Sequence, residues 1–253
     1  MTQLCLNENP FILDETGDFA VVFKPPRMHC APLQKGCGGT LLGWYAAAFP
    51  SVMDISGRKE GEGGLLHRLD FETQGLVLLA KNQASLDFFV AQQDEGNFIK
   101  EYSAVCRKNC ISPSFPAPPF FPLFDSGQGG FAIESFFRPF GPGRKQVRPV
   151  TDSAGNARKT SRIAKDRGGY YRTEILNCAE NGHYAFTLRL RRGFRHQIRC
   201  HLAWIGCPVV NDPLYGEQGA QGCLALRSHG LLFPDPQGGA PREYRIEPLS
   251  PYA

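Results

Sequence analysis

Apolar residues along this chain occur mostly in short runs, and the pattern within these runs favours strands over helices. Residues 76–80 form a continuous apolar segment, which predicts a strand buried on both faces. Residues 184–190 instead place aromatic or leucine side chains at every second position, which predicts a strand with one buried face. Further strands are predicted at residues 19–23, 102–105, 161–164, 171–176, 224–226 and 244–246.

Helices are predicted in three segments, and two of these have a residue typical of a helix end. Residues 40–49 begin at Thr40, a good N-cap, and residues 82–95 repeat apolar side chains at helical spacing. Residues 196–205 end immediately before Gly206, as helices often do. Because strands outnumber helices and rarely alternate with them, we expect an α+β fold with a large mixed, mainly antiparallel sheet and flanking helices.

Several segments are predicted to be irregular. Residues 1–9 are polar, and residues 57–64 form a charged loop rich in glycine. Residues 109–122 contain five prolines, which predicts an exposed excursion or a pocket lid. Residues 136–150 are basic and contain several Pro and Gly residues, so we expect a loop there as well.

Composition favours a soluble, non-secreted protein. The chain has 253 residues, of which 42% are hydrophobic, and no apolar run is long enough to cross a bilayer. The N-terminus lacks a basic region followed by an apolar stretch. Nine cysteines at irregular spacing argue against a disulfide framework or a zinc site. We therefore expect a cytoplasmic protein with reduced thiols.

Positive charge is concentrated in one part of the chain. Residues 138–199 contain 15 Lys or Arg against 4 Asp or Glu, a local net charge of +11, although the whole chain carries only +4. A solvated face of a stable domain is the plainer explanation, but a nearly one-signed segment favours a polyanionic partner such as RNA.

Asp70 is the strongest candidate for chemistry because it lies just before the predicted buried strand at residues 76–80. An Asp in this position often caps a turn through its side chain. Alternatively, rigid backbone at the edge of a core holds a catalytic carboxylate in place. Position alone favours the turn cap.

The segment around Asp70 reads HRLDFETQG and resembles the H-R-L-D-x-x-T-S-G motif of the RluA-type pseudouridine synthases. Gln74 replaces the usual Ser of that motif. The resemblance continues in family order over roughly residues 10–245, through segments 20–26, 100–105, 193–202, 206–216 and, more loosely, 228–236.

The resemblance implies a pseudouridine synthase fold, with a long bent sheet and a central catalytic cleft. It also implies one catalytic domain over residues 10–253, without a separate N-terminal RNA-binding module, so that loops of this domain must select the substrate. The implied activity is isomerisation of uridines in rRNA or tRNA by a monomer with no obligate protein partner. No metal, nucleotide or redox cofactor is required.

Matching positions imply roles for individual residues. Asp70 corresponds to the catalytic carboxylate, Tyr102 to an aromatic residue that stacks on the target base, and Arg199 to the basic partner of the catalytic Asp. If residues 196–205 are helical, Arg195 and Arg199 lie on one face of that helix. RNA contacts are expected from Arg68, Arg144, Lys145, Arg148, Arg195 and His196.

Two other classes of function remain open. A catalytically silent RNA-binding protein is disfavoured because the three candidate catalytic residues are present. A glycosidase needs two carboxylates around the scissile bond, and Glu72 and Asp212 are weak partners for Asp70. Histidines 67, 201 and 229 could suggest a metal site, but no carboxylate or cysteine completes a ligand set, and polar support of the cleft is the favoured interpretation.

Overall fold

The computed structural model describes residues 5–33, 38–108, 114–118, 130–151, 170–216 and 222–249. The chain divides into two compact units. Unit 1 contains residues 1–102 and 226–248, and unit 2 contains residues 103–225 and 249–252. The strand expected at residues 161–164 lies outside the described residues.

Unit 1 is built on strands in the order β1-β2-β3-β9, with β10 paired to β9. All these pairs are antiparallel except β3 with β9, which is parallel. The bounds of the strands are β1 Phe11–Glu15, β2 Phe19–Lys24, β3 Gln74–Ala80, β9 Leu226–Phe233 and β10 Arg242–Arg245. Every residue of β2 and β3 is buried, as the continuous apolar run at residues 76–80 predicts.

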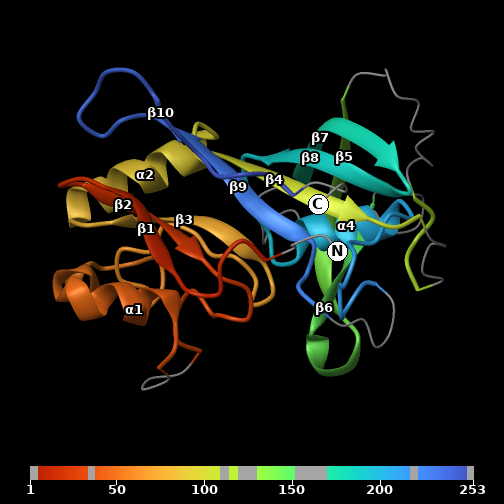
Figure 1. Cartoon of the computed structure of the whole chain (residues 1–253), viewed down its shortest axis with the longest axis horizontal. Helices are drawn as coiled ribbons and strands as arrows, with labels where there is room; N and C mark the ends of the chain where they lie inside the picture. Colours follow the sequence, from red (N-terminus) through yellow and green to blue (C-terminus); the bar gives the residue numbers. More distant parts are fainter. Residues whose placement is uncertain are drawn as a thin grey trace. The chain divides into compact units, whose positions relative to one another are not determined.

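Helices α1 (Leu41–Ala48) and α2 (Gln83–Glu95) lie on either side of strands β1–β3 (Figure 1), and the short helix η1 (Pro50–Asp54) follows α1. Helix α1 begins at the predicted cap, Thr40, whereas the capping role of Asn82 at the start of α2 was not predicted. The side chain of Thr40 accepts a hydrogen bond from the Gly43 amide, and that of Asn82 accepts one from the Ser85 amide.

In unit 2 the strand order is β8-β7-β5-β6. Strand β4 (Ile99–Cys106) contains the division between the units, because Tyr102 belongs to unit 1 and Ser103 to unit 2. The remaining elements are β5 Phe131–Phe140, η2 Pro142–Arg144, β6 Gln146–Val150, β7 Tyr171–Asn181, β8 His183–Leu190 and α4 Gln197–Trp204. Along β8, residues 184, 186, 188 and 190 are buried and those between them are half-buried, which confirms the predicted alternation.

The expected loop at residues 136–150 was wrong, because most of it forms the antiparallel hairpin β5–β6. Strand β5 pairs with β7 through residues 131–135 and with β6 through residues 136–140. Among the described residues, Pro139 therefore lies where β5 pairs only with β6, and Pro149 lies on β6 at the end of the strand order. A proline is tolerated in a strand when its missing N–H faces no partner.

Two other strand predictions need correction. Strand β1 was not expected, although its three consecutive apolar residues lie next to the apolar β2. Strand β9 begins only at Leu226 and continues to Phe233, beyond the predicted segment 224–226. The described strands otherwise confirm a mixed, mainly antiparallel sheet in an α+β fold. In the described part of the chain, no helix is both long enough and apolar enough to span a membrane.

Candidate active site

Asp70 lies in a turn at the start of β3 and is half-buried. Its backbone carbonyl closes the turn by accepting a hydrogen bond from the Thr73 amide at 3.1 Å. The glycine of the motif, Gly75, has a φ of 129°, and a Cβ there would lie 2.2 Å from the carbonyl oxygen of Ser228. Glycine is therefore required for the close parallel approach of β3 to β9, which fixes the end of the Asp70 turn.

A buried lysine fastens the Asp70 turn to the loop after β2. The Nζ atom of Lys24 donates to the carbonyl oxygens of Pro25 and Met28 at 2.8 Å and of Phe71 at 3.3 Å. Burial lowers the pKa of Lys24 to about 8, although the negative charges of Asp70 and Glu72 oppose this shift. Lys24 thus provides positive charge near Asp70 while it holds backbone on both sides of the site.

Tyr102 interacts electrostatically with Asp70 within unit 1. Its side chain is buried, and burial raises the pKa of the phenol, which the charge of Asp70 raises further. A hydrogen bond with Ser228 acts in the opposite direction. The balance keeps Tyr102 neutral near pH 7, so its ring can stack and its hydroxyl can donate a proton in a hydrogen bond.

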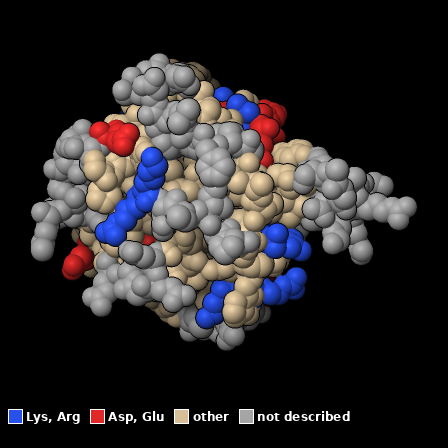
Figure 2. Space-filling view, turned by 90° about the vertical axis from the view of Figure 1, so that its right-hand side faces the viewer, with Lys and Arg blue, Asp and Glu red and all other residues tan. Residues whose placement is uncertain are grey.

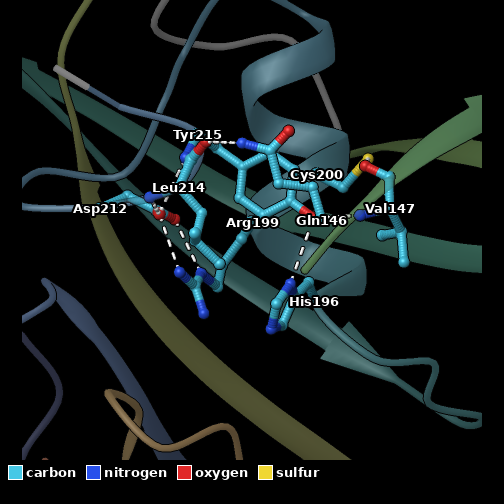
Figure 3. A network of polar contacts seen from close by, with 8 residues as sticks. All are labelled: Gln146, Val147, His196, Arg199, Cys200, Asp212, Leu214 and Tyr215. Atoms are coloured by element: carbon cyan, nitrogen blue, oxygen red, sulfur yellow. Dashed lines mark hydrogen bonds and ion pairs between the residues drawn. The ribbon is translucent and has the colours of Figure 1, made fainter. Parts of the chain in front are cut away.

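Arg199 and Asp212 form a fully buried ion pair in unit 2 (Figure 3). The guanidinium donates from Nε to Oδ2 and from Nη2 to Oδ1, both at 2.8 Å. The amides of Leu214 and Tyr215 also donate to Oδ1, at 2.8 and 3.0 Å. This bidentate geometry fixes Arg199 and satisfies the buried carboxylate.

Tyr215 connects this ion pair to the β5–β6 hairpin. Its ring lies beneath the Arg199 guanidinium, with 5.6 Å between the carbon Cζ and the ring centroid. Its hydroxyl accepts a hydrogen bond from the Val147 amide at 2.7 Å and shares one with Nδ1 of His196 at 3.2 Å. The hairpin, α4 and the turn after Asp212 therefore form one polar network, as Figure 3 shows.

The prediction that Arg195 and Arg199 share a helix face was wrong. Helix α4 begins at Gln197, and the preceding His196 has a φ of 56°, which changes the chain direction. Arg199 is buried, whereas Arg195 is exposed and donates to the carbonyl oxygens of Arg144 at 2.8 Å and Gln146 at 3.1 Å.

The other candidate RNA-binding residues differ in exposure. Arg144 and Lys145 are exposed at the tip of the hairpin. Arg148 is half-buried, with its guanidinium 5.3 Å from the Phe140 ring centroid. Arg68, next to Asp70 in sequence, is exposed and forms an ion pair with Glu62 at 3.2 Å.

The sequence-predicted site residues are thus distributed over both units. Asp70 and Tyr102 lie in unit 1, whereas Arg199 lies in unit 2, and the pairing of Asp70 with Arg199 stays a prediction. Sequence reasoning missed the roles of Lys24 and Asp212. The available signals were a lysine at the end of an apolar strand and an aspartate in the segment that follows the Arg199 helix.

Metal-binding potential is low among the described residues, where no group of three or more His, Cys, Asp or Glu side chains is arranged to hold an ion. His201 instead lies in a buried network, with Nδ1 2.8 Å from Thr173 Oγ1 and Nε2 3.0 Å from Ser135 Oγ. Burial lowers the pKa of His201 to about 3, so the ring is neutral.

Comparison with known proteins places the chain in a family. The family model for RNA pseudouridylate synthase matches residues 18–204, and the chain belongs to this family. This range includes Asp70, Tyr102 and Arg199 together with the turn, strand and helix that carry them.

Among curated relatives, ribosomal large subunit pseudouridine synthase D of Buchnera aphidicola is 28% identical over 203 residues, which are 80% of this chain and 53% of that protein. The protein of the same name from Borreliella burgdorferi is 29% identical over 206 residues, 81% of this chain and 54% of the relative. The chain therefore spans about half the length of these relatives.

Solved structures agree with the fold. Human RNA pseudouridylate synthase domain containing 1 has a TM-score of 0.63 at 20% identity, covering 95% of this chain and 84% of that one. Human RNA pseudouridylate synthase domain containing 4 has a TM-score of 0.56 at 17% identity, covering 95% and 89%.

Proposed function

We propose that this protein isomerises uridine to pseudouridine in RNA, with Asp70 as the catalytic carboxylate. The observation that carries the proposal is the arrangement in unit 1. A half-buried Asp70 and a buried, neutral Tyr102 interact at the start of a fully buried strand, inside the region matched by the family model.

The chemistry breaks the bond between the ribose and a ring nitrogen of uracil and rejoins the ring through carbon. Asp70 acts on the ribose, and the ring of Tyr102 holds the detached uracil by stacking. Because Tyr102 is neutral, it offers a ring face and a hydrogen-bond donor without adding negative charge beside Asp70. Lys24 keeps the turn rigid and supplies compensating charge.

Arg199 is proposed to keep Asp70 ionised during the reaction, as the family resemblance implies. The assignment rests on the order of the motifs in the sequence, since the two residues belong to different units. Its buried ion pair with Asp212 holds the Arg199 guanidinium in one orientation.

The RNA phosphates are proposed to contact the basic surface of unit 2. Figure 2 shows Lys and Arg side chains at several separate places on one face of the molecule. The residues proposed for these contacts are Arg144, Lys145, Arg148, Arg195 and His196, and Arg68 is proposed to occupy the space left by the target base. Because the relatives named above are ribosomal large subunit enzymes, rRNA is the first substrate to test, and tRNA the second. We propose that the protein acts as a cytoplasmic monomer.

The decisive experiment replaces Asp70 by Asn, which keeps the shape of the side chain and removes its charge. Purified wild-type protein should form pseudouridine in ribosomal RNA fragments, and Asp70→Asn should form none while it binds the same RNA with nearly unchanged affinity. Retained isomerisation by Asp70→Asn would exclude Asp70 as the catalytic carboxylate. Binding without isomerisation by the wild-type protein would instead support the catalytically silent alternative.

A further inference from the structure

Phe71, the residue immediately after Asp70, is unusually exposed. Its relative exposure is 39%, and no other phenylalanine in the described ranges exceeds the half-buried class. Single exposed apolar side chains are common on protein surfaces and need no explanation by themselves. Phe71 differs because it lies beside the candidate carboxylate in the sequence and because its ring contacts a second ring.

The second ring belongs to His29, which comes from the loop after β2. The ring centroids of His29 and Phe71 lie 4.6 Å apart with an interplanar angle of 38°. The backbone of His29 is fixed, because its carbonyl accepts a hydrogen bond from the Leu41 amide at 2.9 Å, at the start of α1. The two rings therefore form a small aromatic surface contributed by two loops.

Two buried side chains hold these loops together. The Lys24 ammonium donates to the carbonyl oxygens of both Met28 and Phe71, which precede His29 and carry the exposed ring, respectively. On the other side, the thiol of Cys30 accepts from the Leu69 amide at 3.2 Å and donates to the Leu69 carbonyl at 3.6 Å. The aromatic surface is thus preformed, so little ordering is required when a ligand stacks on it.

We propose that Phe71 and His29 form a stacking platform for an unpaired base next to the target uridine. This inference rests on the function proposed above and narrows its substrate to RNA whose target lies in a loop or a single strand. Aromatic rings bind bases with little sequence preference because every base presents a π face. Arg27, which is exposed and lies two residues before His29 in the sequence, provides positive charge for an adjoining phosphate.

The test uses an RNA stem-loop with one uridine flanked by adenosines in the loop, and matched RNAs in which one flanking adenosine is abasic. Phe71→Leu keeps an apolar side chain but removes the ring, whereas Phe71→Trp keeps a stacking surface. Phe88→Leu serves as the control, because Phe88 is a half-buried phenylalanine on α2. Thermal unfolding of each variant monitors folding.

Phe71→Leu should bind the intact stem-loop roughly tenfold more weakly, while Phe71→Trp and Phe88→Leu bind it like the wild type. Removal of one flanking base should weaken wild-type binding by a similar factor and have no further effect on Phe71→Leu. This coupling distinguishes stacking from a general structural effect.

The platform would be overturned if Phe71→Leu weakened the binding of intact and abasic RNA by the same factor relative to the wild type. It would also be overturned if Phe71→Leu did not weaken binding at all. Either result leaves the proposed function intact if the wild-type protein still forms pseudouridine. If the wild-type protein forms none in any RNA, the proposed function fails, and the platform fails with it.

Discussion

Asp70 in unit 1 and Asp212 in unit 2 are both aspartates of family-like motifs, but their surroundings differ. Asp212 is completely buried, and both of its oxygens accept hydrogen bonds from Arg199 while Oδ1 also caps a turn. Asp70 is half-buried in a turn that is closed by backbone atoms. The buried Asp212 therefore stabilises the structure, whereas the partial exposure of Asp70 is compatible with the substrate role proposed above.

The cations near the two aspartates, Arg199 and Lys24, differ in their hydrogen-bond partners. Arg199 binds its carboxylate directly through a planar fork. Lys24 directs its N–H groups to backbone carbonyl oxygens and influences Asp70 through its charge. In unit 1, the positive charge near Asp70 therefore comes from Lys24, whose hydrogen bonds hold backbone segments in place.

The largest expected effect comes from breaking the buried pair in unit 2. Asp212→Asn should lower the free energy of unfolding by about 3–5 kcal/mol, because it leaves Arg199 charged and buried without its counter-ion. Asp70→Asn should change it by less than about 1 kcal/mol, as is usual outside a core. Urea denaturation of both variants measures this contrast.

A double variant tests the reason for that loss. Arg199→Met combined with Asp212→Asn should be less destabilised than the sum of the two single variants, since no unpaired charge remains. If the stability losses of the two single variants simply add, the Arg199–Asp212 pair contributes no coupling energy. The difference between the Asp212 and Asp70 variants would then come from burial alone.

The next effect is a pH dependence of stability, to which one buried histidine in each unit contributes. Burial lowers the pKa of His67 in unit 1 and of His201 in unit 2 to about 3, and the charge of Lys100 contributes for His67. As pH falls below 6.5, the unfolded chain binds protons that the folded protein excludes, so stability falls until about pH 3. Each histidine contributes a loss of about 2.5 kcal/mol between pH 7 and 4.5.

His201→Gln should therefore flatten the pH dependence by that amount, whatever its effect at pH 7. Denaturation of this variant and of the wild type at several pH values gives the slope. An unchanged slope would mean that the folded protein admits a proton at His201.

A smaller effect is expected for RNA affinity when the hairpin charges are reversed. Arg144→Glu with Lys145→Glu should weaken RNA binding at least tenfold at low salt and reduce the slope of log affinity against log salt by about 1.5, because roughly two phosphate contacts are lost. Lys59→Glu, an exposed reversal in unit 1, provides the matched control for the single reversal Lys145→Glu. Equal effects of the two changes would assign the binding to overall charge and remove the special role of unit 2.

The smallest effect concerns Arg195. Arg195→Ala removes the donor that binds the carbonyl oxygens of Arg144 and Gln146, and should destabilise the hairpin by about 1 kcal/mol. Hydrogen exchange of residues 140–147 should increase without a change in unit 1. Unchanged exchange together with weaker RNA binding would assign Arg195 to phosphate contact alone.

Local patterns predicted much of the fold because they depend on few neighbours. The apolar run in β3, the alternation in β8, the cap Thr40 and the helical spacing in α2 are properties of short segments. The β5–β6 hairpin was missed because Pro139 and Pro149 are acceptable only when their strands lack a partner on one side. That information depends on strand order, which short segments do not encode.

The candidate site was likewise predictable where it depends on short motifs and not where it depends on distant residues. Asp70 and Tyr102 were identified from their motifs, and both lie in unit 1, where burial and the charge of Asp70 raise the pKa of Tyr102. The Arg199–Asp212 pair joins residues 13 positions apart, and α4 begins only after His196, whose φ is 56°. Sequence spacing on an assumed longer helix placed Arg195 beside Arg199 and so could not predict that pair.

The parallel pairing of β3 with β9 has a consequence for synthesis on the ribosome. Gln74 pairs with Arg227 and Gly75 with Ser228, although all of unit 2 up to Ala225 is translated between these two strands. At ribosomal rates of about 5–20 residues per second, the nascent chain carries an unfinished β3 edge for roughly 7–30 s. An exposed apolar strand edge is a site of aggregation. During translation, unit 1 should therefore require chaperones more than unit 2 does.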